Sequence, residues 1–167
     1  NYVAIIALKK PGQRSSDTLP ILTDFILWYA KDLPSIKYRQ LFIQKSLSGD
    51  GGSHYTRLED AAGVVSALRQ EEKINPSLIS QTSRVFETTS MTSAGAQSGE
   101  GKFEFRGKAH RPPAHKHWSA SIQGVNRLAR ANRLDDSGNS IRYKRYFEDF
   151  PFMVRDNRWD DAGLFGV

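Results

Sequence analysis

The sequence contains no cysteine among its 167 residues, so it can form neither a disulfide nor a metal site with thiolate ligands. Its longest hydrophobic run, Val3 to Leu8, is far shorter than the roughly 20 residues that a membrane-spanning helix needs. No charged and then apolar leader opens the chain. These absences predict a cytoplasmic protein without a membrane partner.

The sequence also lacks the motifs that carry most enzyme chemistry, because it has no glycine-rich phosphate loop, no nucleophile elbow and no metal-binding helix. Three histidines, His110, His115 and His117, lie close together, but no cysteine or suitably spaced acid joins them as a metal ligand. A loop that lends neutral donors to DNA and a merely solvated loop are the alternatives for this segment. We expect no catalytic residue and no metal site within this chain.

What the sequence does have is a local excess of positive charge. Residues 101–158 carry 13 basic and 6 acidic side chains, whereas residues 1–100 carry 11 and 10, and the whole chain has a net charge of +6. A local excess of this kind is expected of a protein that meets phosphate groups, since neutralising them releases counterions. A solvated basic face is the alternative.

The first 42 residues have the pattern of one edge of an α/β sheet. Residues 2–9 form a continuous apolar, β-branched run, which predicts a strand covered on both faces. A loop rich in Pro, Gly and Ser follows, then a second buried strand over 24–32 and a shorter, half-exposed strand over 36–42.

The middle of the chain is predicted to be less regular. Residues 46–55 have the composition of a flexible connector, and residues 80–101, rich in Ser, Thr and Gly, that of a weakly ordered loop. Between them, Thr56 and Glu59 have capping-box spacing, and apolar residues recur at helical spacing. We therefore expect a helix over about 57–73.

The basic part of the chain combines cations with aromatic side chains. A short strand over 103–105 and a turn at Gly107 are expected first. Residues 121–134 predict an amphipathic helix with Ser121 as its cap and arginines on its polar face, and residues 140–147 predict a strand. Because Arg and Lys pair with phosphate and aromatic faces accept unstacked bases, these segments favour a nucleic-acid partner. Aromatic core residues beside solvated cations are the alternative.

Five blocks of the sequence resemble, in order, bacterial N6-adenine (N4/N6 class) DNA methyltransferases, including those related to type III modification subunits. They are KKPGQRSSDTLPILTDFILWYAKD, KYRQLF, FEFRGKAHRPPAHKHWSASIQGVNRLARANRL, GNSIRYKRYFEDFP and NRWDD. The resemblance implies an α+β fold, with edge strands of an α/β methyltransferase sheet in residues 1–33. A mixed α/β target recognition domain would follow over 34–158, and residues 159–167 would begin the return to the methyltransferase core.

Two hallmarks of that family are missing from these residues. Its catalytic tetrapeptide is an Asp or Asn followed by Pro-Pro and an aromatic residue, but Pro112-Pro113 is preceded by Arg111. No Phe-x-Gly-x-Gly loop for S-adenosylmethionine occurs either. We therefore expect this chain to be inactive alone, and its start at Asn1 suggests excision from a longer polypeptide.

The resemblance implies that the parent enzyme uses S-adenosylmethionine and flips a target adenine out of the helix, whose N6 then attacks the methyl group. No cofactor is expected for these 167 residues themselves. The implied partners are double-stranded DNA, the rest of the methyltransferase chain and a restriction subunit. The expected function is DNA recognition for a site-specific adenine-N6 DNA methyltransferase of the restriction-modification type. The alternative is a stand-alone, non-catalytic nucleic-acid-binding module.

The candidate DNA contacts come from a loop near the active-site mouth, from the histidine-rich segment, from the polar helix face and from the last basic strand. Trp118 is equally suited to the core. The candidates are Arg14, Ser15, Ser16, His115, Lys116, His117, Trp118, Arg127, Arg130, Arg142, Lys144 and Arg145.

Overall fold

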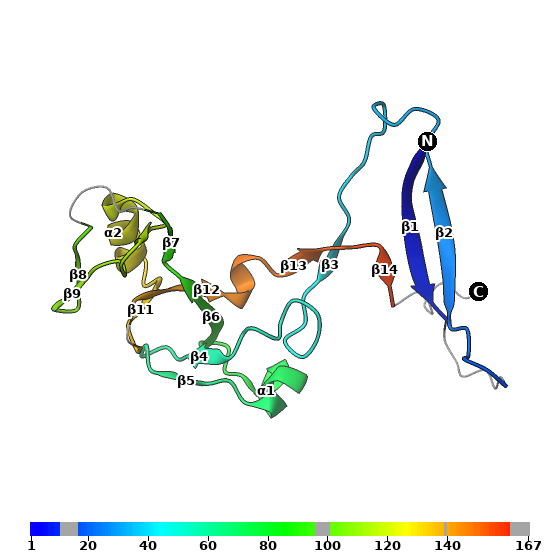
Figure 1. Ribbon diagram of the computed structural model, residues 1–167. Coiled ribbons are helices and arrows are strands. Elements are labelled where there is room, and N and C mark those ends of the chain that lie inside the picture. The colour runs from blue at the N-terminus through cyan, green and yellow to red at the C-terminus, as the bar shows by residue number, and fades with distance from the viewer. Residues whose placement is uncertain (11–16, 96–100, 139, 161–167) are drawn as a thin grey trace. The chain divides into compact units, whose positions relative to one another are not determined.

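The computed structural model describes residues 1–10, 17–95, 101–138 and 140–160 (Figure 1). The chain divides into two compact units, of which the first takes residues 1–44 and 152–167 and the second takes Lys45–Pro151. The second unit is thus an insertion in the sequence of the first. The expected boundaries after residues 33 and 158 lie several residues from this division. The predicted contacts Arg14, Ser15 and Ser16 lie outside the described residues.

The first unit is built on a long antiparallel hairpin. β1 pairs with β2 along its whole length, β14 pairs in parallel with the other edge of β1, and β3 pairs antiparallel with β13. The elements are β1 (Tyr2–Lys9), β2 (Thr23–Tyr29), β3 (Phe42–Gln44), β13 (Phe152–Val154) and β14 (Arg158–Trp159).

The strands expected over 2–9 and 24–32 are confirmed, although the second ends at Tyr29. The strand expected over 36–42 is wrong, because β3 begins only at Phe42. The expected burial is also wrong, since Phe25 and Leu27 in β2 are 64% and 57% exposed. All described hydrophobic side chains that are buried belong to the second unit.

The second unit is centred on a five-stranded antiparallel sheet in the order β11-β12-β6-β4-β5, and two shorter pairs, β10-β7 and β8-β9, accompany it. Its strands are β4 (Arg57–Glu59), β5 (Val65–Ala67), β6 (Arg84–Ser90), β7 (Thr92–Ala94), β8 (Phe103–Phe105), β9 (Lys108–His110), β10 (Lys116–Trp118), β11 (Leu134–Asp135) and β12 (Arg142–Tyr146). Its helices are α1 (Gln70–Ile74), α2 (Ile122–Arg130) and two 3-10 turns, η1 (Pro76–Leu78) and η2 (Phe147–Asp149).

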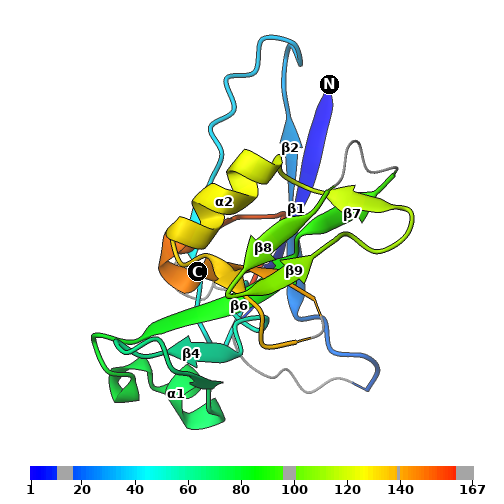
Figure 2. The ribbon, with the colours of Figure 1, turned by 90° about the vertical axis from the view of Figure 1, so that its left-hand side faces the viewer.

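Two hydrophobic clusters form the core of this unit. The helix α2 covers the first cluster with Val125, which is fully buried, and lies beside β8 (Figure 2). Ser121 caps α2 as expected, because its Oγ accepts a hydrogen bond from the backbone N–H of Gly124 at 3.2 Å. The first cluster comprises Met91, Phe103, Trp118, Val125, Leu134 and Ile141, and the second comprises Leu47, Tyr55, Leu68 and Val85.

The middle of the chain differs most from expectation. The residues predicted as a helix over 57–73 form the hairpin β4-β5 and only a short helix, α1. Asp60 closes this hairpin, since its Oδ1 accepts from the backbone N–H groups of Ala62 and Val64 at 2.9 and 2.8 Å. Gly63, at φ +81°, supplies a left-handed turn that a helix cannot use.

The described parts of the segments predicted to be flexible contribute core residues and strands. Residues 46–55 contain Leu47 and Tyr55, which are buried in the second cluster. Within 80–101, residues Arg84–Ser90 form β6, which lies between β12 and β4 in the sheet, and Thr92–Ala94 form β7. Residues 96–100 lie outside the described residues. The Ser and Thr content therefore reflects exposed strand faces as well as loops.

Glu59 is buried at the centre of a polar network instead of capping a helix. Its carboxylate accepts from Lys144 Nζ at 2.7 Å, from Asn132 Nδ2 at 3.1 Å and from the Tyr146 hydroxyl. The side chains of Glu59 and Lys144 are only 6% and 3% exposed. The network joins β4, β12 and the turn after α2, so it fixes the strands of the sheet to one another.

The expected fold class is wrong. Strands account for 37% and helices for 14% of the described residues, and every strand pair except β1-β14 is antiparallel. The second unit is a curled antiparallel half-barrel instead of a mixed α/β domain. The first unit has no crossover helix in its described part, so it is a hairpin-based sheet instead of the edge of an α/β methyltransferase sheet.

Candidate nucleic-acid interface

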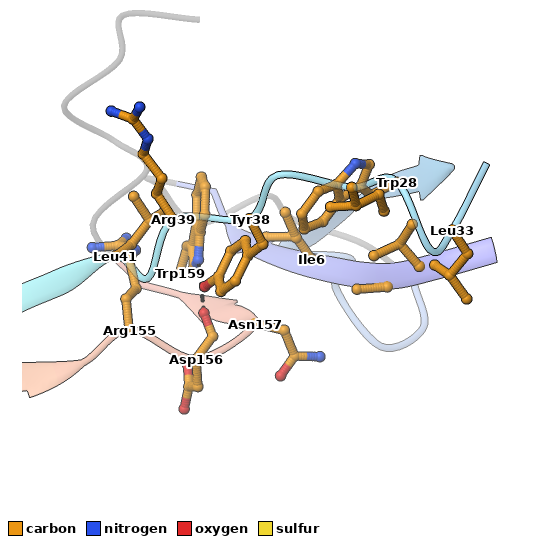
Figure 3. A pocket seen from close by; sticks show the side chains of 13 residues that line it. Ile6, Trp28, Leu33, Tyr38, Arg39, Leu41, Arg155, Asp156, Asn157 and Trp159 are labelled. Atoms are coloured by element: carbon orange, nitrogen blue, oxygen red, sulfur yellow. Dashed lines mark hydrogen bonds between the residues drawn. The ribbon is translucent and has the colours of Figure 1, made fainter. Parts of the chain in front are cut away.

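Two hollows in the described surface are large enough for a small ligand, and they differ in chemistry. The first, about 610 Å³, lies in the first unit beside β1 (Figure 3). Aromatic and aliphatic side chains dominate it, with the rings of Trp28 and Tyr38 5.9 Å apart between centroids. Its lining residues are Val3, Ala4, Ile6, Trp28, Leu33, Ile36, Tyr38, Arg39, Leu41, Arg155, Asp156, Asn157 and Trp159.

Three polar side chains that line this apolar hollow are engaged with the protein. Asn157 Nδ2 donates to the carbonyl of Ile5 at 2.9 Å, Trp159 Nε1 donates to the carbonyl of Asp156 at 2.9 Å, and the Arg155 guanidinium stacks on Trp159. A specific ligand site needs a few convergent polar groups in addition to an apolar wall. The hollow therefore has the character of an uncovered sheet face.

The second hollow, which we call the basic cleft, encloses about 480 Å³ in the second unit. Cations and hydroxyl groups line it, above a floor that includes Trp118 and Ile141 of the first hydrophobic cluster. No Asp or Glu of the described chain is among its lining residues. These residues are Ser90, Thr92, Ala109, His110, Arg111, Pro113, Lys116, Trp118, Ser140, Ile141 and Arg142.

No acidic side chain in the described part of the chain neutralises the three cations of the basic cleft. Within the described ranges, Arg111, Lys116 and Arg142 form no ion pair. Arg142 Nη2 donates to the backbone carbonyl of Thr88 at 3.0 Å, which orients its guanidinium without removing its charge. Three like charges with no counter-ion repel one another, and an anion in the cleft relieves that repulsion.

The cations are held by ordered backbone. Lys116 and Trp118 lie on the same side of β10, which pairs with β7, and Trp118 Nε1 donates to the carbonyl of Gly101 at 2.7 Å. Arg142 begins β12 opposite Ser90 of β6. Arg111 precedes a Pro pair whose fixed φ angles restrict the loop to β10.

The histidines of this segment have separate positions. His110 lines the basic cleft and its ring lies 6.4 Å from that of Phe103, while His117 points to the opposite side of β10 from Lys116. His115 is exposed and has a left-handed φ of 61°. No group of three metal-ligating side chains is found in the described part of the chain.

The structure places the other predicted contacts in three kinds of environment. Arg127 and Arg130 lie on the exposed face of α2 and do not line the cleft. Arg145 is paired with Glu87, directly opposite on β6, at 3.1 Å. Lys144 is 2% exposed and its ammonium faces Glu59, so it is an interior residue that a DNA backbone cannot reach.

Predicted contacts that the structure brings together are therefore Lys116, Trp118 and Arg142 at one cleft. Sequence reasoning missed Arg111, Ser90, Thr92 and Ser140, which also line it. A signal for β6 was available, because RVFETTS is rich in β-branched and aromatic side chains. No signal in the sequence showed that β7 would pair with β10.

Comparison of the chain with protein-family models, curated proteins and solved structures finds no match. Among the described residues, no helix has the length and apolar character required to cross a membrane. The resemblance to adenine methyltransferases thus has the sequence blocks as its sole support.

Proposed function

We propose that this chain is a DNA-recognition portion of a site-specific adenine-N6 DNA methyltransferase, and that its second unit holds duplex DNA. The observation that carries the proposal is the basic cleft, which Arg111, Lys116 and Arg142 line and to which no described carboxylate contributes. Backbone contacts by Arg and Lys position a protein on DNA without reading its sequence. The methyltransferase context is supported by the five sequence blocks.

Other exposed cations extend the basic surface beyond the cleft. Arg127 and Arg130 on α2 form no ion pair with a described residue. Arg145 keeps a partly exposed side chain beside Glu87. In this proposal they are further backbone contacts, and Lys144 contributes only to stability.

The experiment is duplex binding by the 167-residue chain at low salt, measured by fluorescence anisotropy with an excess of single-stranded competitor. We expect duplex binding that survives the competitor and weakens as salt rises, because counterion release drives it. An absence of duplex binding at low salt would contradict the proposal.

The methyltransferase context has its own test. In this proposal S-adenosylmethionine, the rest of the methyltransferase chain and a restriction subunit belong to the parent assembly. We expect no methyl transfer to adenine by the 167 residues alone, and transfer by the full-length parent. A parent that binds the duplex without methylating it would favour the stand-alone recognition module instead.

A further inference from the structure

We propose that the basic cleft is a phosphate-binding site, in which one phosphate group accepts hydrogen bonds from Arg111, Lys116 and Arg142. The inference rests on the proposed function for the source of the phosphate, which is nucleic acid. It goes further in assigning a defined pocket and ligand group instead of a diffuse basic face.

The charge of the cleft selects the ligand class. Three formal positive charges line a hollow of about 480 Å³ that has no acidic lining residue in the described ranges. A backbone phosphodiester carries one negative charge, like a carboxylate, and presents two non-bridging oxygens, whereas a terminal phosphate carries up to two charges and presents three oxygens. The two guanidinium forks match adjacent phosphate oxygens, and the ammonium acts as a point charge.

Hydroxyl groups add donors that a phosphate uses. Ser140 Oγ is in the lining and makes no hydrogen bond with a described residue. Ser90 and Thr92 are already ordered, because Ser90 Oγ lies 3.1 Å from the carbonyl oxygen of Thr92 and 3.2 Å from its hydroxyl. Serine and threonine hydroxyls commonly contact phosphate oxygens in protein–DNA complexes.

The site is ordered before a ligand enters. The loop between Pro113 and β10 is closed by a hydrogen bond from the Lys116 N–H to the Pro113 carbonyl at 3.1 Å. The carbonyl of His115 accepts from the Gly95 N–H at 3.0 Å, which joins this loop to the end of β7. Little backbone ordering remains to oppose binding, so the cations can act with small entropic cost.

The size of the cleft exceeds that of a phosphate alone and falls within the range of small-molecule sites. Ala109, Pro113 and the floor residues Trp118 and Ile141 give it apolar walls beside the cations. A phosphate therefore carries an attached sugar into the cleft. The phosphate could belong to a continuous backbone or to a 5′ end, and DNA ligands can separate these sources.

The first test uses inorganic phosphate and pyrophosphate as probes, titrated into the intact chain and followed by 1H–15N NMR. We expect saturable shifts at the Trp118 indole N–H and at the amides of Arg111, Lys116 and Arg142. Arg111→Ala, Lys116→Ala and Arg142→Gln should each weaken binding by at least about tenfold, the effect of losing one charged hydrogen bond. Lys9→Ala, Lys31→Ala and Lys37→Ala, exposed cations of the first unit, serve as matched controls.

The second test compares duplexes with 5′-phosphate and 5′-hydroxyl ends, and competes each with pyrophosphate. Equal affinity and competition indicate a backbone phosphate, and a preference for the 5′-phosphate indicates an end; both support the inference. Duplex binding without phosphate shifts or effects of the three substitutions would overturn the inference and leave the proposed function standing. Saturable phosphate binding without duplex binding would overturn the proposed function alone. Circular dichroism of each variant identifies loss of fold, and a misfolded variant is replaced by Arg111→Gln or Lys116→Gln.

Discussion

At the residue scale, Glu59 matters most to the stability of the second unit. Its carboxylate has three donors from separate elements, Lys144, Tyr146 and Asn132, and it lies almost entirely out of solvent. Tyr146 is itself flanked by guanidinium groups, those of Arg84 and Arg133, at 3.5 and 4.6 Å from its ring centroid. Lys144, which the sequence analysis includes among the candidate DNA contacts, is therefore an interior residue.

We expect Glu59→Ala to lower the free energy of unfolding of the second unit by about 3–5 kcal/mol, because it leaves the Lys144 ammonium buried without a counter-ion. Glu148→Ala is the matched control, since Glu148 pairs with Arg84 at the surface, and exposed pairs contribute about 1 kcal/mol or less. Urea unfolding followed by the NMR signal of the Trp118 indole measures both. Equal effects of the two substitutions would show that Glu59 is not the centre of the network.

The same network predicts a pH dependence. Burial by itself raises the pKa of Glu59, but the hydrogen bonds from Lys144, Tyr146 and Asn132 together outweigh it and hold that pKa below 4.5. Burial also raises the pKa of Asp149, but hydrogen bonds from Arg133 and from the Tyr146 N–H outweigh that effect. The pKa of Asp149 therefore lies below 3.8. Both carboxylates thus stabilise the folded state above their unfolded pKa values, and this contribution is lost as the pH falls through the folded values.

We therefore expect the unfolding free energy of the second unit to fall as the pH drops below about 4.5, where the unfolded state binds more protons. Glu59→Gln should make this acid fall shallower, because the variant has no proton to take up at position 59. Urea midpoints at several pH values between 7 and 3 provide the measurement. An equally steep loss of stability at low pH in Glu59→Gln and in the unchanged chain would show that Glu59 does not contribute to the pH dependence.

At the scale of elements, capping residues and apolar spacing predicted a helix correctly only where tertiary contacts favoured the same element. The helix over 121–134 has a Ser cap and a single apolar face, and α2 forms there, ending at Arg130. The equally helical spacing of 57–73 failed because Asp60 and Gly63 close a tight turn and β4 completes a sheet with β6. That pairing joins residues far apart in sequence, which periodicity cannot reveal.

The turn of β4-β5 can be tested through its glycine. Gly63→Ala should lower the stability of the second unit by roughly 1–2 kcal/mol, because a side chain disfavours the left-handed φ of +81°. Gly138→Ala is a suitable control, since that position is equally open but has no left-handed φ. Thermal unfolding should show a lower melting temperature for Gly63→Ala only. Equal melting temperatures of the two variants would show that the left-handed turn at Gly63 does not stabilise the hairpin.

The candidate site was only partly predictable for the same reason. Lys116, Trp118 and Arg142 lie in basic-aromatic segments that the sequence made visible, but the partners Ser90 and Thr92 come from a segment that composition marked as loop. Lys144 was misplaced because alternation along β12 does not say which face the sheet buries. The identity of that face depends on Glu59, two strands away in the sheet.

At the scale of the whole molecule, the two units differ in how much apolar surface they bury. The described part of the first unit has no buried hydrophobic side chain, whereas the second has two clusters. Backbone amides of β1 and β2 should therefore exchange with deuterium faster than those of β6 and β12, because local opening exposes little further surface. Hydrogen exchange resolved by NMR provides the comparison, and stronger protection in β1 and β2 would contradict the described burial.

The division of the chain predicts that the second unit folds alone. Its two ends are adjacent, because the Lys45 N–H donates to the Pro151 carbonyl at 2.8 Å. We expect a polypeptide of residues 45–151 to retain the amide chemical shifts of Glu59, Val125 and Tyr146 seen in the whole chain. Random-coil chemical shifts for these amides in the excised unit would show that its core depends on the first unit.

The central claim is that the basic cleft holds a phosphate group of duplex DNA. Its most direct test is the salt dependence of duplex affinity for the unchanged chain and for the combined variant R111A/K116A/R142Q. The control is K9A/K31A/K37A, which removes the same charge from the first unit. We expect the cleft variant to bind more weakly and to lose roughly one unit of slope in log affinity against log salt, because the cleft holds one phosphate. Unchanged affinity and slope in the cleft variant, or equal losses in the control, would contradict the claim.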